Sequence, residues 1–169
     1  MIVLGIDPGL AGGIAVVKGT RGAPALIAVI DIPTSGADAK RRVDPIAVIR
    51  FIQEHNPDFA VIERAQAMPD QGSSSGFSYG RAVGYLECCV LGMEIPLEIV
   101  EPRAWKKTHG LSGRGPDGTK LSSPEVKEQS RQKALLLFPG SSFFARKLDH
   151  GRAEAALIAE HGRRLRAGQ

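Results

Sequence analysis

Apolar residues open the chain in short runs that are separated by turn-forming residues. Residues 2–6 (IVLGI) and 14–17 (IAVV) are apolar and rich in β-branched side chains, and Pro and Gly dominate the DPGLAGG segment between them. Short apolar runs bounded by turn residues are typical of buried strands. The pattern therefore predicts two strands joined by a tight connection, and residues 23–33 (APALIAVIDIP) predict a third strand that closes a meander.

Helical and strand patterns then alternate along the chain. Asp44 and Pro45 precede apolar residues at helical spacing, which predicts a helix that ends at Asn56. Residues 58–63 (DFAVIE) have the pattern of a short buried strand that ends in an acid. The alternation continues with a Gly/Ser loop at 70–76, a helix at 77–93, a strand at 96–102 and a short helix from Pro102.

The last part of the sequence predicts two more helices. A Gly-, Pro- and Ser-rich loop at 110–123 precedes a helix that starts near Ser123 and stops at Pro139, and Asp149 precedes the final helix. An antiparallel hairpin followed by strand–helix alternation predicts an α/β fold, with a mixed central sheet flanked by helices. We expect one domain over residues 1–165 and a short basic tail over 166–169.

Composition supports a single globular domain and excludes several classes of protein. The chain has 169 residues, of which 43% are hydrophobic and 24% charged, and no apolar run approaches the ~20 residues that a membrane helix needs. The first residues lack the pattern of an export signal, so we expect a cytoplasmic protein without a membrane partner. The two cysteines, Cys88 and Cys89, are adjacent, which predicts reduced thiols rather than a disulfide or a zinc site.

Acids stand at the ends of two predicted strands and at the start of the last helix. Asp7 and Glu63 each end a strand, and the carboxyl ends of neighbouring parallel strands meet at one edge of a sheet. Glu154 and His150 are four residues apart on the last helix, so they share a helix face. Carboxylates gathered in this way need a cation, and hard oxygen ligands suit Mg²⁺ or Mn²⁺.

Each of these acids also has a purely structural explanation. Asp7 can be a turn residue beside Pro and Gly, Asp149 can serve only as a helix cap, and Glu154 can pair with Arg152 or Lys147 on the surface. Three acids at matching ends favour the metal site instead. Two ions about 4 Å apart in such a site can activate a water and stabilise the leaving oxygen in phosphodiester hydrolysis.

Three motifs, GIDPGLAGGIAVV, VIERAQAM and DHGRAEAALIA, resemble those of the RuvC-type Holliday junction resolvases, and the SGFSYGRAVGYLE and EPRAWKK segments are similar to their counterparts in that family. The resemblance covers about residues 2–160 in family order. Sugar kinases and chaperone ATPases open with a similar acid–Gly turn, but they need two such domains around a nucleotide. The resemblance implies a ribonuclease H-like fold and a Mg²⁺-dependent homodimer that cuts four-way DNA junctions in recombination and repair, without a small-molecule cofactor.

The resemblance also assigns site residues, with one departure. Asp7, Glu63 and Glu154 match three acidic positions of the family, although Asp is more usual where Glu154 stands. The fourth position generally lies three residues before the last acid, which here is Gly151. We expect His150 to supply the missing metal ligand and catalytic group, with Asp149 as the alternative. An imidazole ligand would make Mn²⁺ a substitute for Mg²⁺ or the preferred ion.

Basic residues predict a surface for DNA. The net charge is +4 with a pI near 9.3, and Lys and Arg cluster over residues 101–133. Such clusters bind phosphate backbones, although a solvated helix face is the plainer explanation for any single cation. Lys107 resembles a family lysine near the scissile phosphate, and Met68 is the candidate wedge between bases, with Phe77 and Tyr79 behind it. The remaining candidate DNA contacts are Arg81, Lys106, Arg131 and Lys133.

Two other functions stay open on the sequence alone. A junction-binding protein without catalysis would retain this fold, and the departure at Gly151 keeps that alternative open. A ribonuclease H-fold nuclease that acts on other branched DNA or on RNA–DNA hybrids would need 2′-hydroxyl contacts, which the sequence does not reveal. Neither the sequence preference at the cut nor the biological setting, host recombination or processing of viral DNA, follows from these residues.

Overall fold

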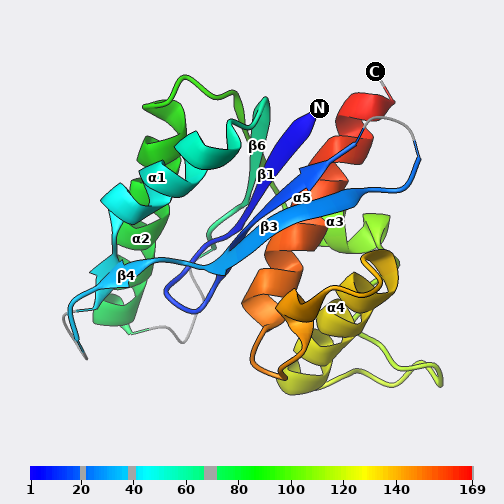
Figure 1. The fold of residues 1–169 in the computed structure, drawn as a ribbon. Helices are drawn as coiled ribbons and strands as arrows, with labels where there is room; N and C mark the ends of the chain where they lie inside the picture. Colours follow the sequence, from blue (N-terminus) through cyan, green and yellow to red (C-terminus); the bar gives the residue numbers. More distant parts are fainter. Residues whose placement is uncertain (20–21, 38–40, 67–71, 169) are drawn as a thin grey trace.

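A five-stranded mixed sheet forms the centre of the computed structural model, which describes residues 1–19, 22–37, 41–66 and 72–168 (Figure 1). The strands lie in the order β3-β2-β1-β6-β7. The first three pair antiparallel, whereas β6 and β7 add in parallel beside β1. The bounds are β1 Ile2–Asp7, β2 Gly13–Lys18, β3 Ala25–Asp31, β6 Phe59–Glu63 and β7 Leu97–Val100.

Helices cover both faces of this sheet. The strand residues alternate between two apolar cores, one shared with α1 and α2 and the other with α5, α3 and α4. Figure 1 shows α1 and α2 together on one side and the remaining helices on the other. The bounds are α1 Pro45–His55, α2 Ser73–Leu91, α3 Pro102–Thr108, α4 Ser123–Leu137 and α5 His150–Ala167.

The last helix lies directly on the first strand. Gly5 makes this possible, because a Cβ atom at that position would overlap the Ala155 carbonyl oxygen and the Ala159 nitrogen. Farther along, the absence of a Cβ at Gly162 leaves room for Val61 of β6. Helix and strand therefore approach through backbone, which holds the start of α5 at a fixed distance from the end of β1.

Most of the predicted elements form where the sequence placed them. Asp44 caps α1 through its side chain, which accepts from the Ile46 and Ala47 nitrogens, and a Ser122–Glu125 capping box starts α4. Cys88 and Cys89 are free thiols, as predicted. Within the described residues, none of the helices has the length and hydropathy needed to cross a bilayer.

Four details differ from the prediction. Helix α2 starts at Ser73, so part of the expected 70–76 loop is helical. The polar segment after β3 contains a small two-stranded sheet, β4 (Thr34–Ser35) with β5 (Arg42–Val43). A short 3₁₀ helix, η2 (Ser142–Phe144), precedes α5, and α5 itself runs to Ala167, into the expected tail. The 3₁₀ helix forms where Phe144 packs into the core, which the local sequence pattern does not specify. The same pattern does not specify where α5 ends.

Candidate active site

Three carboxylates lie near the edge of the sheet where β1 and β6 end, close enough to act on one another electrostatically. Ile6 and Ile62 are paired in register on these parallel strands, so Asp7 and Glu63 follow at adjacent ends. Helix α5 lies over β1 and brings Glu154 to the same edge. The prediction that these strand ends adjoin is therefore confirmed, and the electrostatic coupling described next joins Glu154 to them.

Burial and mutual repulsion shift the ionisation of this group. Burial raises the pKa of Asp7 well above its ordinary value, and the neighbouring carboxylates of Glu154 and Glu63 raise it further. Burial also raises the pKa of Glu63, against the effect of a hydrogen bond from Trp105 and the charge of Lys106. The three acids act on one another as a single electrostatic group, and a bound cation would relieve the cost of ionising them together.

Neutral donors fix the orientation of two of the acids. Trp105, fully buried on α3, donates from Nε1 to Glu63 Oε2 over 2.5 Å. Ser130, buried on α4, donates from Oγ to Glu154 Oε1 over 3.0 Å. Each carboxylate is thus held through one oxygen by a group without charge. Sequence reasoning missed Trp105 and Ser130, because nothing local to α3 or α4 indicates which strand or helix they contact.

Two lysines lie close enough to the acids to act on their charge. Lys106 and Lys127 both lower the pKa of Asp7, and both come from helices that border the sheet edge. Lys106 also lies over the Trp105 ring, with Nζ 5.1 Å from the ring centroid. Lys127 was absent from the predicted site, although its position on the helix after the basic loop was visible in the sequence. Lys107 is exposed and lines a groove with Arg103 and Lys106.

The structural explanation for Glu154 does not apply. The guanidinium of Arg152 binds Asp31 of β3 through two hydrogen bonds of 2.6 and 2.7 Å, so Arg152 has another partner. Lys147 lies near Glu128 and lowers its pKa. Glu154 instead accepts a hydrogen bond from Ser130 and interacts electrostatically with the other acids.

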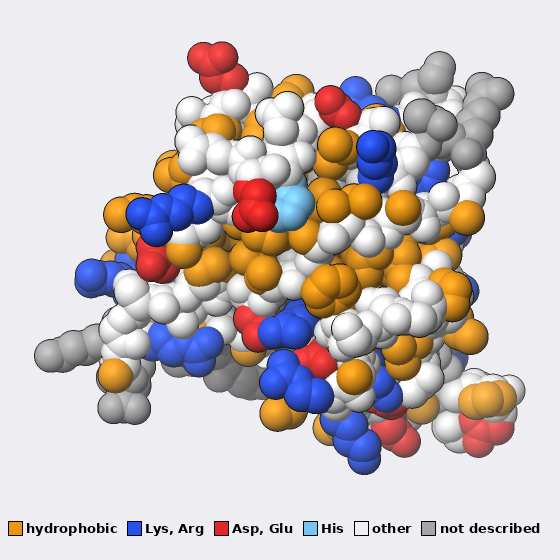
Figure 2. All heavy atoms as spheres, in the orientation of Figure 1, with side chains coloured by type: hydrophobic (Ala, Val, Ile, Leu, Met, Phe, Trp, Pro, Cys, Tyr) orange, Lys and Arg blue, Asp and Glu red, His pale blue; other side chains and the backbone are white. Residues whose placement is uncertain are grey.

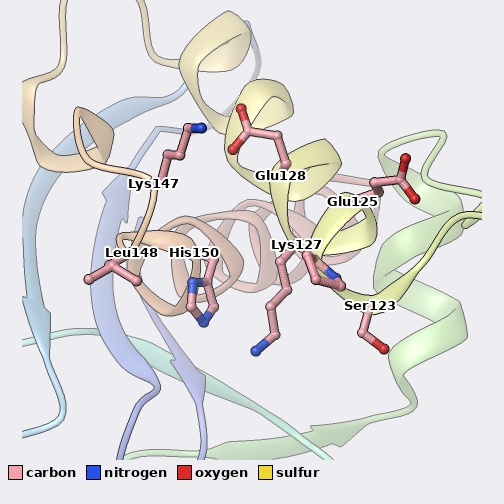
Figure 3. A pocket seen from close by; sticks show the side chains of 8 residues that line it. Ser123, Glu125, Lys127, Glu128, Lys147, Leu148 and His150 are labelled. Carbon is pink, nitrogen blue, oxygen red and sulfur yellow. The ribbon is translucent and has the colours of Figure 1, made fainter.

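Asp149 and His150 begin α5 in different environments. Asp149 is 2% exposed, and its carboxylate accepts from the backbone nitrogen, Nε and Nη2 of Arg146 over 2.7–2.9 Å. Burial raises the pKa of Asp149, but these hydrogen bonds outweigh it and hold the pKa below its usual range. Asp149 occupies the N-cap position of α5, where the sequence allowed it, but its side chain makes no capping hydrogen bond and binds Arg146 instead. His150 is half-buried and lines a pocket beside Lys127 (Figure 3).

Gly151 has a steric reason to be glycine. A Cβ atom there would lie 2.5 Å from the Ala11 carbonyl oxygen and 2.9 Å from Gly12 Cα. The turn that follows Asp7 therefore packs backbone to backbone against the first turn of α5. An aspartate at position 151 would have no room for its side chain, so the space that a fourth acid would need is filled by the chain itself.

The acids suit a divalent cation, although they do not form a preformed cage. Across residues 1–19, 22–37, 41–66 and 72–168, no three His, Cys, Asp or Glu side chains are gathered closely enough to hold an ion as they stand. Mg²⁺ needs only one or two carboxylates and takes its other ligands from water and substrate phosphates. The mutual repulsion at Asp7 marks where positive charge would be stabilised. Asp7, Glu63 and Glu154 therefore carry oxygen donors of the kind that suit a divalent cation, which would take its remaining ligands from water and phosphate.

The predicted DNA contacts are placed unequally. The guanidinium of Arg131 is buried, where it binds Glu128 and the Phe144 carbonyl oxygen, so it is not available to DNA as expected. Lys133 is half-buried on the same helix. Figure 2 shows that Lys and Arg side chains around the α4 end of this face alternate with Asp and Glu and do not form an unbroken basic surface.

Helix α2 carries two aromatic residues near its start, and one of them, Tyr79, lies near the acids. Phe77 is exposed, with the Arg81 guanidinium 5.9 Å from its ring centroid. Tyr79 packs over Gly9 in the turn after β1. Burial raises the pKa of Tyr79 to about 12, with further contributions from Asp7 and Glu63, so its phenol keeps its proton at neutral pH. Met68, the predicted wedge, lies outside the described residues.

Known proteins resemble the chain in sequence. No protein-family model matches it. It is 36% identical over 119 residues to the crossover junction endodeoxyribonuclease RuvC of Sorangium cellulosum, covering 68% of this chain and 64% of that protein. Against the RuvC of Alkalilimnicola ehrlichii it is 30% identical over 122 residues, covering 69% and 73%. The RuvC of Streptomyces griseus is 33% identical over 119 residues, but the match spans only 57% of its length.

Solved structures resemble it over nearly the whole fold. The Thermus thermophilus RuvC in complex with Holliday junction substrate superposes with a TM-score of 0.67 at 19% identity, covering 99% of this chain and 96% of that one. The yeast mitochondrial Holliday junction resolvase Ydc2 gives a TM-score of 0.61 at 14% identity, covering 98% and 78%. These likenesses confirm the predicted fold class, a mixed α/β sheet of the ribonuclease H-like type.

Proposed function

The chain belongs to the RuvC family of crossover junction endodeoxyribonucleases, and from that premise we propose that it cuts four-way DNA junctions by metal-dependent phosphodiester hydrolysis. The observation that carries the proposal is the electrostatic coupling of Asp7, Glu63 and Glu154 at the edge of the sheet. A structural protein gains no stability from buried acids that repel one another, whereas a metal-dependent nuclease needs them.

Each residue has a definite part in this proposal. A divalent cation at the three acids would activate a water and stabilise the leaving oxygen. Trp105 and Ser130 hold Glu63 and Glu154 in orientation, so that little rearrangement is needed when the ion and the phosphate arrive. Lys106 and Lys127 offset the charge of a phosphate that approaches the acids.

Three labelled substrates test the reaction. The full chain is incubated with a four-way junction, a duplex of matching sequence and an RNA–DNA hybrid, each with Mg²⁺, with Mn²⁺ and without metal. We expect symmetric cuts in the junction alone, and only with metal. Cutting of the hybrid would favour a different nuclease, and junction binding without cutting under any condition would identify a catalytically impaired binder.

The metal preference tests the position left open by Gly151. We propose that His150 rather than Asp149 completes the site, because Arg146 binds the Asp149 carboxylate while His150 lies beside Lys127. Nitrogen is a softer donor than oxygen, so Mn²⁺ should support faster cutting than Mg²⁺ in the wild type. His150→Ala should lose much of that advantage.

The control for this comparison is Asp149→Asn. It should lower the free energy of unfolding by about 1–3 kcal/mol through lost charge-assisted hydrogen bonds from Arg146. The ratio of the Mn²⁺ and Mg²⁺ rates should stay at the wild-type value. An unchanged ratio in His150→Ala together with a collapsed rate in Asp149→Asn would reverse the assignment.

We also propose a homodimer, since symmetric cuts across a two-fold junction need two sites related by the same symmetry. Helix α2 packs Ala82, Leu86 and Val90 inward and leaves Tyr85 and Leu91 on its outer side. Light scattering at micromolar concentration should give twice the mass of one chain, and a strict monomer that still cuts both strands in a coordinated way would contradict this. Action in the cytoplasm stays a prediction from the sequence.

A further inference from the structure

A pocket of about 410 Å³ lies between the start of α4 and the segment 147–150 that leads into α5. Its walls include Pro124 and Lys127 of α4 and Lys147, Leu148 and His150 of that segment. We call it the α4–α5 pocket. His150 of the lining lies four residues, about one helical turn, before Glu154 on α5, so the pocket adjoins the acid group on that side. None of the roles assigned above uses its apolar wall.

Leu148 gives this pocket its most unusual feature. Its side chain is 80% exposed, although it is a large apolar residue directly before the buried Asp149. The turn that carries it is well fixed, because Arg146 donates its backbone nitrogen to Asp149 Oδ2 over 2.8 Å and Asp149 donates its own to the Arg146 carbonyl oxygen over 3.0 Å. The fold thus holds an apolar side chain in solvent at the wall of the pocket, where it contributes nothing to the core.

The basic and acidic side chains of the pocket extend in different directions. Figure 3 shows the side chains of His150 and Lys127 extending the same way, with Leu148 beside His150, while Glu125 and Glu128 point away from them. Both glutamates already have partners, since Glu125 closes the capping box with Ser122 and Glu128 binds Arg131. The side toward which His150 and Lys127 extend therefore combines an apolar surface, an imidazole ring and a lysine.

We propose that the α4–α5 pocket receives an unstacked nucleotide of the DNA strand that is cut, with its base against Leu148 and Pro124 and its phosphate near Lys127. The proposal rests on the proposed function and names a subsite beside its acids. The volume lies in the range of pockets that enclose small organic ligands. Apolar side chains such as leucine and proline pack against unstacked bases, and a lysine recognises the phosphate as a point charge. His150 lines this pocket and also shares a face of α5 with Glu154.

Unstacking at the cut is measured first, without metal. Four-way junctions carry 2-aminopurine at each nucleotide on either side of the cut, and its emission rises when the base leaves the stack. We expect wild-type protein to raise the emission at one of these positions. Leu148→Ser should abolish the rise, and Leu148→Phe should preserve it. Leu136→Ser is the matched control, because Leu136 is 79% exposed on the same side of the sheet but lies outside the pocket lining.

Cleavage under single-turnover conditions provides the second measurement. Leu148→Ser should cut about tenfold more slowly, the order expected for one lost apolar contact, while Leu136→Ser and Leu148→Phe cut at the wild-type rate. Melting temperatures should not differ among the variants. No emission change at any position, or wild-type behaviour of Leu148→Ser in both measurements, would overturn the proposal. Emission that rises while wild-type protein cuts nothing would leave the pocket in place and contradict the nuclease activity instead.

Discussion

The two ends of α5 carry acidic side chains in opposite electrostatic surroundings. Near the C-terminal end, Glu160 is fully buried and binds Arg163 over 2.5 Å and Arg164 over 2.7 Å. Near the N-terminal end, Glu154 accepts a hydroxyl hydrogen bond from Ser130 and repels Asp7. The fold neutralises Glu160 with two arginines, whereas Glu154 has no such cation in the described part of the chain and is available to a bound ion. Burial of an acid alone therefore does not mark a site, but burial among other acids does.

Removing charge at the N-terminal end should have the largest effect. Glu154→Gln and Asp7→Asn each remove an oxygen ligand of the proposed metal, so junction cleavage should fall by about a thousandfold or more. Gel-shift binding of the junction should stay the same or tighten, because less negative charge faces the phosphates. Cleavage by either variant near the wild-type rate would rule out the metal site.

The same change at the C-terminal end should act on stability instead. Glu160→Gln leaves two arginine side chains without their carboxylate, one of them buried, and should lower the free energy of unfolding by about 3–5 kcal/mol. Urea denaturation measures this loss. Cleavage per folded molecule should be unaffected at low temperature. If Glu160→Gln proved as stable as wild type, the distinction between the two ends would fail.

His109, at the end of α3, contacts the middle of α5 and should make the stability of the protein sensitive to acid. His109 is 3% exposed and makes a 2.7 Å hydrogen bond from Nε2 to the Leu157 carbonyl oxygen of α5. Burial lowers its pKa to about 4, so the unfolded chain binds a proton near pH 6.5 that the folded protein does not bind. The stability is therefore complete above pH 6.5 and declines as the pH falls toward 4, by up to about 3 kcal/mol.

Denaturation at pH 7 and at pH 5 in wild type and His109→Gln measures this effect. The variant cannot take up a proton at this position, so its unfolding free energy should fall less between the two pH values. The loss of unfolding free energy between pH 7 and pH 5 is compared between the two proteins, because burial also lowers the pKa of His161 and contributes to the loss in both. Equal slopes would mean that His109 does not stay neutral in the folded protein.

The smallest expected effect concerns the backbone contact at the N-terminal end. Gly151→Ala places a methyl group against the Ala11 carbonyl oxygen and should lower the free energy of unfolding by about 1–3 kcal/mol. Gly80→Ala is the matched control on helix α2, since no atom lies within 4 Å of a Cβ built there. That substitution should stabilise by up to about 1 kcal/mol through helix propensity. If Gly151→Ala were more stable than wild type, the turn after Asp7 would have to move away from the added methyl group at little cost, contrary to this prediction.

Much of the fold followed from periodicity, because the strands and helices here are short and bounded by clear signals. Asp7 and Glu63 were predictable for the same reason, since each ends a strand and parallel strands bring their ends together. The partners of these acids were not predictable. Trp105, Ser130 and Lys127 reach them across distances in sequence that only the packing of α3 and α4 on the sheet decides.

The expectations for charged residues failed where one cation had a closer partner. Arg131 looked like any other basic residue of the cluster, yet Glu128 lies one helical turn away and binds it. Asp149 looked like a helix cap, but Arg146 precedes it by the same short separation. A sequence shows such possible pairs without showing which of them form. The steric reason for Gly151 depends on a turn far away in the chain and could not be predicted at all.

The dependence of the acid group on α5 has a consequence during synthesis of the protein. Asp7 leaves the ribosome before Glu154, because the helix that covers β1 and supplies Glu154 is made more than a hundred residues later. Until then, the apolar face of β1, β2 and β6 that α5 covers lacks its partner, and the long separation makes this contact slow to form. A nascent chain that has not yet produced α5 therefore holds two of the three acids and cannot assemble the group. The proposed hydrolysis of DNA therefore begins only after α5 has emerged and docked on the sheet.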